Sequence, residues 1–326
     1  MKKRIIVITT GGTIAMKKGE NGGLVPAVSG EDLAAAVPGL SRWADVEVLE
    51  FSNVPSGWMT DEKMMELSKR IDRLSEENRA DGFVVTHGTD TLEETAFFLA
   101  ATLRAEKPVC VTGAMRGASE LSADGPENIL SAVRVAADEN SKGMGVLVCL
   151  QDRIYSAWDV TKGHTTNPDT FRDLQYGPLG TVYSEEIVYA RRPMPHTKLH
   201  PETPAKKVWI LPTWSGMDGD TVRIAGEANP DGLVIDALGC GNVPPKCREE
   251  IMKLGERGIP MILTVRVPMG SVMEEYGYEG SIRSMKASGI LSGGRLSAWK
   301  ARLLLALALG ISKDPKEIKK ILGNLN

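Results

Sequence analysis

The sequence predicts an α/β protein: a mainly parallel sheet sandwiched by helices in a larger N-terminal domain, followed by a smaller C-terminal α/β domain. Two observations predict this fold. Short apolar runs rich in β-branched residues recur along the chain, and each is followed by a longer segment with helical periodicity. The same alternation resumes after a proline-rich stretch at residues 191–207. Strands that alternate with helices form parallel sheets, because each crossover helix packs on a sheet face.

The N-terminal half begins this alternation within its first ten residues. The expected strands are Ile5–Ile8, Val46–Phe51, Phe83–Val85, Val109–Val111 and Val146–Leu150. The expected helices are Asp61–Asn78, Thr91–Leu103 and Glu127–Asp138. The first helix has apolar residues at helical spacing, which we expect in the core: Met64, Met65, Leu67, Ile71 and Leu74.

Residues 191–207 separate the two halves. Four prolines in this stretch exclude a helix and predict an extended linker: Pro193, Pro195, Pro201 and Pro204. We therefore expect domains at 1–190 and 208–326. The expected strands of the second domain are Val208–Leu211, Leu233–Ile235 and Met261–Val265, and its expected helices are Lys246–Arg257, Ser297–Leu309 and Pro315–Leu322.

Composition narrows the classes of function. The chain has 326 residues, 42% hydrophobic and 25% charged, with a formal net charge of −3 and no basic run longer than Lys2–Arg4. Neither nucleic acid nor a membrane surface is therefore an expected partner. The apolar run Ile5–Ile8 is too short for a signal peptide, so we expect a soluble, cytoplasmic protein. The cysteines lack CxxC spacing and are expected as buried reduced thiols: Cys110, Cys149, Cys240 and Cys247.

Glycine- and hydroxyl-rich segments follow three of the expected strands. They are Thr9–Ala15, Thr86–Thr91 and Thr112–Arg116. Ligands bind outside the carboxyl ends of parallel strands, so we expect these segments to converge on one crevice. The first could be a phosphate loop or a plain turn, but its spacing matches neither G-x-G-x-x-G nor a P-loop.

Thr89 and Asp90 offer two interpretations. Asp90 precedes an expected helix and could simply cap it. Thr89 beside it carries a hydroxyl that becomes a nucleophile only with an activating partner, such as a lysine held by a carboxylate. Lys162 is a candidate partner, although local sequence alone also fits a solvated surface lysine. His87 is expected to order the turn by hydrogen bonds and not to act as a catalytic base.

In combination, these segments resemble a known family. The sequences TGGTIA (Thr10–Ala15) and THGTDT (Thr86–Thr91) resemble the two signatures of the bacterial-type L-asparaginases. The resemblance continues, in order and over nearly the whole chain, through Gly113–Arg116, Ser122–Asn128, Asp159–Lys162, Tyr176–Gly180, Gly241–Asn242 and Arg266–Gly270.

The resemblance implies a homotetramer, a dimer of dimers, that hydrolyses L-asparagine to L-aspartate and ammonia without a metal or organic cofactor. It implies that Thr13 is the first nucleophile and forms an acyl-enzyme. Thr89, Asp90 and Lys162 match the second triad, which shuttles protons. The implied substrate-binding positions are Ser56, Gly57, Gly88, Thr89, Asp90, Ala114 and, from a partner subunit, Asn242.

Two positions depart from the family's pattern. Many members assist the threonine with a tyrosine in the loop after the first motif, and residues 16–26 contain none. Some relatives use a C-terminal tyrosine, so Tyr276 is the candidate here and Tyr278 the fallback. Gly57 stands where many members have a side-chain amide, which leaves the preference between asparagine and glutamine open.

Three classes of function follow. The first is a free amidohydrolase for asparagine, with glutaminase-asparaginase of broad specificity as a variant. The second is an ammonia-donating amidotransferase subunit, which in relatives carries an extra N-terminal domain, whereas this chain enters its first strand at Arg4. The third is a non-catalytic metabolite-binding protein, which would leave Thr13 and Thr89 without purpose.

Two further patterns are set aside. Ser297 and Lys300 have the S-x-x-K spacing of serine acylases without the accompanying motifs. His196 and His200 have metal-like spacing but lie in the proline-rich stretch and not on a helix, so exposed loop histidines are expected.

Overall fold

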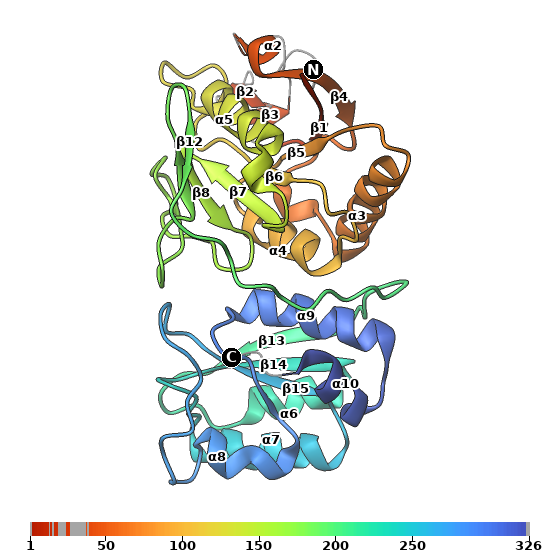
Figure 1. The fold of residues 1–326 in the computed structure, drawn as a ribbon. Coiled ribbons are helices and arrows are strands. Elements are labelled where there is room, and N and C mark those ends of the chain that lie inside the picture. Colours follow the sequence, from red (N-terminus) through yellow and green to blue (C-terminus); the bar gives the residue numbers. More distant parts are fainter. Residues whose placement is uncertain are drawn as a thin grey trace. The chain divides into compact units, whose positions relative to one another are not determined.

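The computed structural model describes residues 2–12, 14, 16–18, 24–26, 37 and 39–323. The chain divides into two compact units, Met1–Lys198 and Leu199–Asn326. Each unit is built on its own sheet with helices on both faces (Figure 1). The structure thus confirms the predicted α/β class with a mainly parallel sheet in the larger, N-terminal unit.

The first unit contains an eight-stranded sheet in the order β12-β11-β8-β7-β6-β5-β1-β4. Its strands are β1 (Lys3–Thr9), β4 (Ala44–Glu50), β5 (Gly82–Thr86), β6 (Val109–Thr112), β7 (Val146–Leu150), β8 (Arg153–Ser156), β11 (Gly180–Val182) and β12 (Ile187–Tyr189). The five strands from β4 to β7 pair in parallel, as predicted. The antiparallel edge formed by β8, β11 and β12 is not predicted from the sequence, because strands this short carry no clear periodicity.

The helices α3 (Asp61–Glu76), α4 (Leu92–Thr102) and α5 (Gly125–Ala137) cover the two faces of this sheet. Alternate residues of β1 show the division. Ile6 and Ile8 pack in the core shared with α3 and α4, whereas Ile5 and Val7 pack in the core shared with α5. Each buried strand therefore reads as a continuous apolar run, because both of its faces are covered.

Two small hairpins, one short α-helix and two 3-10 turns, Ser56–Trp58 and Glu139–Ser141, complete the described part of this unit. The hairpins are β2 (Met16–Lys18) with β3 (Leu24–Pro26), and β9 (Thr161–Lys162) with β10 (Phe171–Arg172); the helix is α2 (Leu40–Trp43). The β9–β10 hairpin matters for the site because it carries Lys162.

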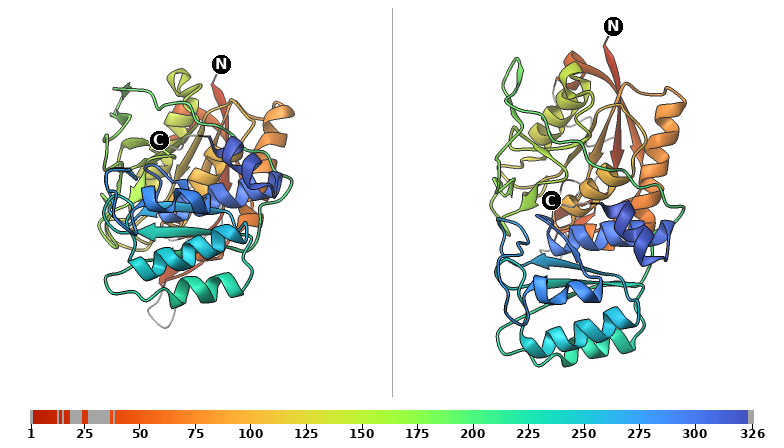
Figure 2. Two further views of the ribbon diagram at one scale, coloured as in Figure 1. Left: turned by 90° about the horizontal axis from the view of Figure 1, so that it is seen from below. Right: turned by 60° about the horizontal axis from the view of Figure 1, so that its bottom comes forward.

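The second unit contains a parallel sheet in the order β13-β14-β15-β16. The strands are β13 (Val208–Pro212), β14 (Gly232–Ala237), β15 (Met261–Val265) and β16 (Leu291–Ser292). The helices α6 (Asp220–Glu227), α7 (Pro245–Glu256) and α8 (Ile282–Met285) cover one face, and α9 (Ala298–Ile311) and α10 (Pro315–Leu322) lie on the other side (Figures 1 and 2). The sequence predicts α7, α9 and α10 but not the shorter α6 and α8.

Residues 190–207, all of them described, form neither helix nor strand, as their prolines predict. Three of the predicted buried thiols are buried, while Cys240 is partly exposed; all four cysteines are free. The Cys110 thiol and burial together raise the pKa of the Cys149 thiol.

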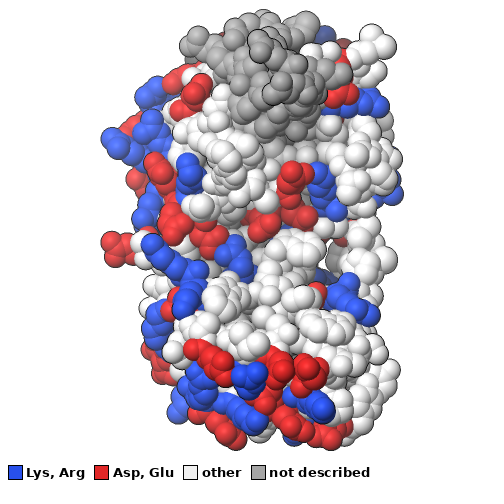
Figure 3. Space-filling view, turned by 180° about the vertical axis from the view of Figure 1, so that it is seen from behind, with Lys and Arg blue, Asp and Glu red and all other residues white. Residues whose placement is uncertain are grey.

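Charge and hydropathy agree with the composition. On the face drawn in Figure 3, basic and acidic side chains are interspersed. Within the described residues, no helix combines the length and the apolar character needed to cross a membrane.

Candidate active site

The three polar segments predicted to converge do meet at the carboxyl ends of β1, β5 and β6. The Thr10 hydroxyl donates to the carbonyl of Thr86, 2.9 Å away, and so ties the end of β1 to the end of β5. The backbone N–H of His87 donates to the carbonyl of Thr112 at 2.8 Å, which ties β5 to β6. Neighbouring parallel strands bring these ends together, so residues far apart in sequence form one site.

Glycines allow the loops after β1 and β5 to touch. A Cβ on Gly12, which has a φ of 87°, would lie 2.2 Å from Gly88 Cα, and a Cβ on Gly88 would lie 2.9 Å from the Ser56 hydroxyl oxygen. Side chains at these two positions would force the loops apart. The backbone around Gly88 therefore lies directly against Ser56. Thr13, the predicted first nucleophile, lies outside the described residues.

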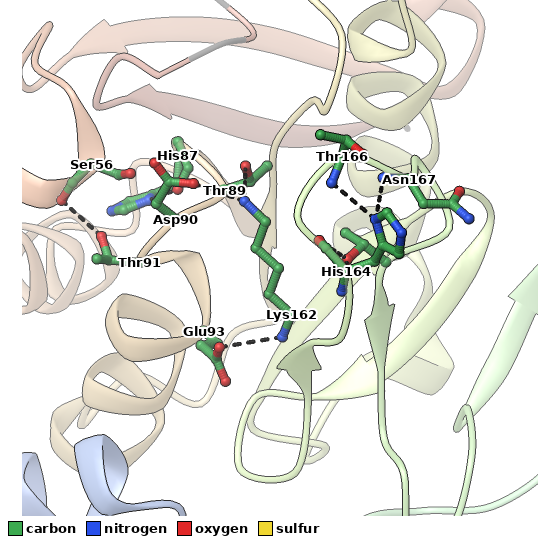
Figure 4. A network of polar contacts seen from close by, with 12 residues as sticks. Ser56, His87, Thr89, Asp90, Thr91, Glu93, Lys162, His164, Thr166 and Asn167 are labelled. Carbon is green, nitrogen blue, oxygen red and sulfur yellow. Dashed lines mark hydrogen bonds and ion pairs between the residues drawn. The ribbon is translucent and has the colours of Figure 1, made fainter. Parts of the chain in front are cut away.

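Thr89, Asp90 and Lys162 form the polar cluster that the sequence predicts (Figure 4). The Lys162 ammonium group lies 3.0 Å from the Thr89 hydroxyl oxygen and 2.8 Å from Asp90 Oδ1. The side chain of Lys162 is only 15% exposed, whereas that of Asp90 is 82% exposed. Lys162 is therefore not the solvated surface lysine that its local sequence also allows.

Asp90 is not the cap of the following helix. Helix α4 begins at Leu92 and its N-cap residue is Thr91. The Asp90 carboxylate binds the lysine instead, and most of it stays open to a ligand.

Glu93 supports Lys162 from the interior, a contact that the sequence does not predict. Its Oε1 accepts a hydrogen bond from the backbone N–H of Lys162 at 3.2 Å. Its side chain is 6% exposed, and its Oε2 has no hydrogen-bond partner among the described residues. The position of Glu93 in the first turn of α4 favours a negative charge there. The first turn of α4 holds two glutamates, Glu93 and Glu94, and the sequence does not show which of them is buried.

Ser56 is held in place by Thr91. The Thr91 hydroxyl donates to the carbonyl of Ser56 at 2.7 Å, and Ser56 is 7% exposed at the start of a short 3-10 turn, Ser56–Trp58. Gly57 beside it is exposed, and a Cβ there would meet no atom within 4 Å. The structure thus leaves open space at Gly57, and the role that the resemblance implies for this position stays a prediction.

His87 orders the turn by hydrogen bonds, as predicted. Its Nδ1 lies 2.8 Å from the carbonyl oxygen of Gly88, and its Nε2 lies 2.9 Å from the Thr95 hydroxyl. A carbonyl only accepts, so Nδ1 carries the hydrogen and Nε2 accepts from Thr95. Burial lowers the pKa of His87 to about 4, and the ring is neutral at pH 7.

Ala114 lies on the third segment, next to Thr89. A Cβ on the preceding Gly113 would lie 3.3 Å from the Thr89 methyl carbon and 2.5 Å from the His87 carbonyl oxygen. Ala114 itself is 1% exposed. The backbone of this segment thus packs against the loop that carries the threonine.

Asn242 and Tyr276 belong to the second unit. The Asn242 backbone N–H donates to the Leu238 carbonyl at 2.9 Å. Tyr276 is 46% exposed, and its ring centroid lies 5.2 Å from that of Tyr278. The roles implied for Asn242 and for either tyrosine stay predictions.

The serine acylase-like pair Ser297 and Lys300 and the histidine His196 have structural roles. Ser297 is the N-cap residue of α9, and Lys300 is buried within that helix. His196 stacks on Trp158, with ring centroids 3.9 Å apart and an interplanar angle of 5°. In the described part of the chain, no group of three or more His, Cys, Asp or Glu side chains is arranged to hold a metal ion.

A threonine hydroxyl, an ammonium group and a carboxylate at the carboxyl ends of parallel strands are the groups of a nucleophilic or acid–base enzyme. Comparison with known proteins specifies the class. The family model described as Asparaginase, N-terminal matches residues 4–195, and the model described as Glutaminase/Asparaginase C-terminal domain matches residues 207–322. The chain belongs to the asparaginase family.

Individual relatives agree with this assignment. The chain is 36% identical to L-asparaginase 2 of Escherichia coli, over 97% of this chain and 92% of the relative. It is 30% identical to a glutaminase-asparaginase of Pseudomonas aeruginosa, over 97% and 89%. A crystal structure described as "Probable Cytoplasmic L-asparaginase" from Campylobacter jejuni matches with a TM-score of 0.88 and 33% identity, over 98% of this chain and 99% of that one.

Proposed function

We propose that this protein is an L-asparagine amidohydrolase, which converts L-asparagine and water to L-aspartate and ammonia. One observation carries the proposal: Lys162 reaches both the Thr89 hydroxyl and the Asp90 carboxylate from a separate hairpin. A weakly acidic hydroxyl becomes a useful nucleophile or proton relay only beside such a group. The full-length similarity to proteins named L-asparaginase supports the substrate.

The proposed reaction proceeds through an acyl-enzyme. The Thr13 hydroxyl oxygen bonds to the side-chain carboxamide carbon, the C–N bond breaks, and ammonia leaves with the proton it needs. Water then attacks the ester, the bond to the Thr13 oxygen breaks, and L-aspartate is released. Thr89 and Lys162 move protons between these groups. The roles of Thr13 and of the triad rest on the family resemblance, and the Lys162 contacts support them.

The substrate's two charged groups have proposed partners. The largely exposed Asp90 carboxylate would hold the α-ammonium group, and the Ser56 hydroxyl would hold the α-carboxylate. Backbone groups of Gly88, Thr89 and Ala114 would bind the amide end. Backbone N–H groups that stabilise an oxyanion are often worth about 3–4 kcal/mol each in the transition state.

A glutaminase-asparaginase of broad specificity is the second candidate, and Gly57 favours it. The open space at Gly57 removes one wall that an amide side chain would form. A single methylene group changes discrimination by only about 1–3 kcal/mol in a simple pocket. The relative from Pseudomonas aeruginosa named a glutaminase-asparaginase supports this alternative.

We further propose that the protein works as a homotetramer in which Asn242 completes the site of a partner subunit, with Tyr276 assisting Thr13. We also propose a cytoplasmic location, which the Campylobacter jejuni neighbour supports. The oligomeric state and the roles of Asn242 and Tyr276 rest on the family resemblance, whereas the location rests on the short apolar run Ile5–Ile8 and on that neighbour.

Ammonia release from L-asparagine and L-glutamine tests the proposal. We expect Thr13→Ala and Thr89→Val each to lower kcat for asparagine by at least ~1,000-fold. Thr102→Val is the control, because Thr102 is buried at the opposite end of α4 and should keep near-normal turnover. The absence of ammonia from both amides with folded wild-type protein would contradict the amidohydrolase function.

A further inference from the structure

Two buried side chains at the start of α5 hold the loop after β6, residues 113–117, in place. Asp124 and Asn128 lie at the start of α5 and are 8% and 1% exposed. Asp124 is the N-cap residue of α5, yet its carboxylate makes no capping hydrogen bond with that helix. Both side chains turn toward the loop that contains Ala114.

The Asp124 carboxylate accepts hydrogen bonds from two consecutive amides of the loop. The backbone N–H of Met115 donates to Oδ2 at 3.1 Å, and that of Arg116 donates to Oδ1 at 2.9 Å. The side-chain amides of Asn128 and Gln151 also donate to Oδ2, at 3.2 Å and 3.4 Å. Four N–H groups thus compensate a carboxylate that is buried.

Asn128 holds the other side of Ala114. Its Nδ2 donates to the Gly113 carbonyl at 3.0 Å as well as to Asp124, and its Oδ1 accepts from the Gln151 backbone N–H at 2.9 Å. The Gln151 amide fixes which end of the side chain is oxygen. Asn128 therefore uses both of its N–H donors, and its side-chain amide cannot flip without losing these hydrogen bonds.

These contacts fix both peptide planes next to Ala114. The Gly113 carbonyl belongs to the plane that contains the Ala114 N–H, and the Met115 N–H belongs to the plane that contains the Ala114 carbonyl. In a trans peptide the C=O and N–H point in opposite directions. Because Met115 N–H points at Asp124, the Ala114 carbonyl points away from it. Among the described residues, the Ala114 carbonyl has no hydrogen-bond partner.

We infer that Asp124 and Asn128 form a clamp that aims the Ala114 carbonyl at the carboxamide of the substrate. They are positioning residues that act through Ala114 and do not touch the substrate. This inference rests on the proposed function, in which Ala114 binds the amide end. Displacing a positioned group by about 1 Å can cost ~100-fold in rate.

The test compares three variants. Asn128→Asp keeps the shape of the side chain but replaces its two donors with an oxygen that faces the Gly113 carbonyl and Asp124. Gln151→Ala removes only the longest bond to Asp124 and is the milder variant. Ser131→Ala is the matched control, because Ser131 lies on the same helix, is 0% exposed and donates one side-chain hydrogen bond, to Asp152.

We expect Asn128→Asp to lower kcat for asparagine by ~100-fold with a smaller change in KM, and Gln151→Ala to lower it by a few-fold. Ser131→Ala should lose stability and keep its kinetic constants. Hydrogen exchange of the peptide that covers residues 113–117 should become faster in Asn128→Asp and not in Ser131→Ala. This readout does not require turnover and also applies to Gln151→Ala.

Three results would contradict the proposed clamp. They are wild-type kcat in folded Asn128→Asp, unchanged exchange at residues 113–117 in both Asn128→Asp and Gln151→Ala, and an equal loss of kcat in Ser131→Ala. If wild-type protein releases no ammonia from either amide, the proposed function fails and the clamp's role in catalysis fails with it. Faster exchange in the clamp variants would then still show that these side chains hold the loop.

Discussion

His87 shows how a single buried side chain links the site to stability. Its ring joins the Gly88 carbonyl to Thr95 on helix α4, so it fixes the turn that precedes Thr89. The hydrogen bond that Nε2 accepts from Thr95 requires the neutral ring. A proton on Nε2 would leave the Thr95 hydroxyl to find another acceptor within the core.

We predict that His87 makes the protein less stable in acid. Burial lowers its pKa to about 4 from an ordinary value of 6.5. Above pH 6.5 both the folded and the unfolded chain are neutral at this residue, and it contributes no pH dependence. Between pH 6.5 and pH 4 the unfolded chain binds a proton that the folded chain excludes, so the free energy of unfolding falls as pH falls, by up to about 3 kcal/mol.

Urea unfolding of the wild type and of His87→Asn at several pH values measures this effect. Subtracting the two curves removes the contributions of groups that both proteins share. The stability advantage of the wild type should shrink as the pH is lowered from 7 to 4. A difference that stays constant over this range would show that His87 is not the responsible group.

The contact between two loops sets the geometry around Ser56 and Thr89. The loops that follow β1 and β5 touch at Gly12 and Gly88, and this contact brings Ser56 beside the loop that carries Thr89. Neither loop has a long side chain at the contact, so their separation depends on the two glycines.

We predict that Gly12→Ala lowers both stability and turnover. Its Cβ would lie 2.2 Å from Gly88 Cα, so one loop must move, and the φ of 87° adds backbone strain. Each effect typically costs about 1–3 kcal/mol. Gly145→Ala is the matched control: Gly145 has a φ of 71°, and a Cβ there would meet no atom within 4 Å, so the substitution adds strain without displacement.

Denaturant unfolding and kcat for asparagine should separate the two variants. Gly145→Ala should lose about 1–2 kcal/mol of stability and keep its turnover. Gly12→Ala should lose more stability and at least ~10-fold in kcat, because Gly88 and Thr89 shift with the loop. Equal stability losses together with normal turnover in Gly12→Ala would show that the loop contact is unimportant.

The packing of strands and loops explains which parts of the molecule the sequence predicts. The parallel strands are buried on both faces, so they appear as apolar runs, and the polar segments that follow them mark the site. The contact between Lys162 and Thr89 joins residues 73 apart and depends on a hairpin of two-residue strands. No local periodicity indicates such a hairpin, so the residues alone made Lys162 only a candidate partner for Thr89, and the family resemblance implied its place in the triad.

Glu93, Asp124 and Asn128 show a second reason why the sequence alone does not predict every residue of the site. Each is a buried polar residue whose partners come from other elements. In the sequence, Asn128 has the pattern of any polar residue in an amphipathic helix. Its function follows from the direction of its amide, which depends on the Gln151 backbone in a distant turn. Hydrogen bonds between elements depend on which elements are neighbours in the folded protein, and residue spacing along the chain does not predict this.

At the scale of the whole molecule, the proposed role of Asn242 requires more than one subunit. The family resemblance implies that this residue enters the site of a partner, so each complete site would combine the Thr89 of one chain with the Asn242 of another. In a symmetric dimer the same interface then completes two sites. Two inactive variants with different defects can therefore restore one another.

We predict that mixed oligomers of Thr89→Val and Asn242→Ala regain activity. In a mixed dimer, the Asn242→Ala chain supplies an intact Thr89 and the Thr89→Val chain supplies an intact Asn242, so one of the two sites is complete. Random pairing makes half of the dimers mixed and therefore restores roughly a quarter of the sites. Unfolding and refolding the two variants together, followed by an ammonia assay, measures this recovery. Each variant refolded alone is the control and should stay nearly inactive. If the mixture is no more active than the separate variants while native mass spectrometry shows mixed oligomers, Asn242 acts within its own chain or not at all.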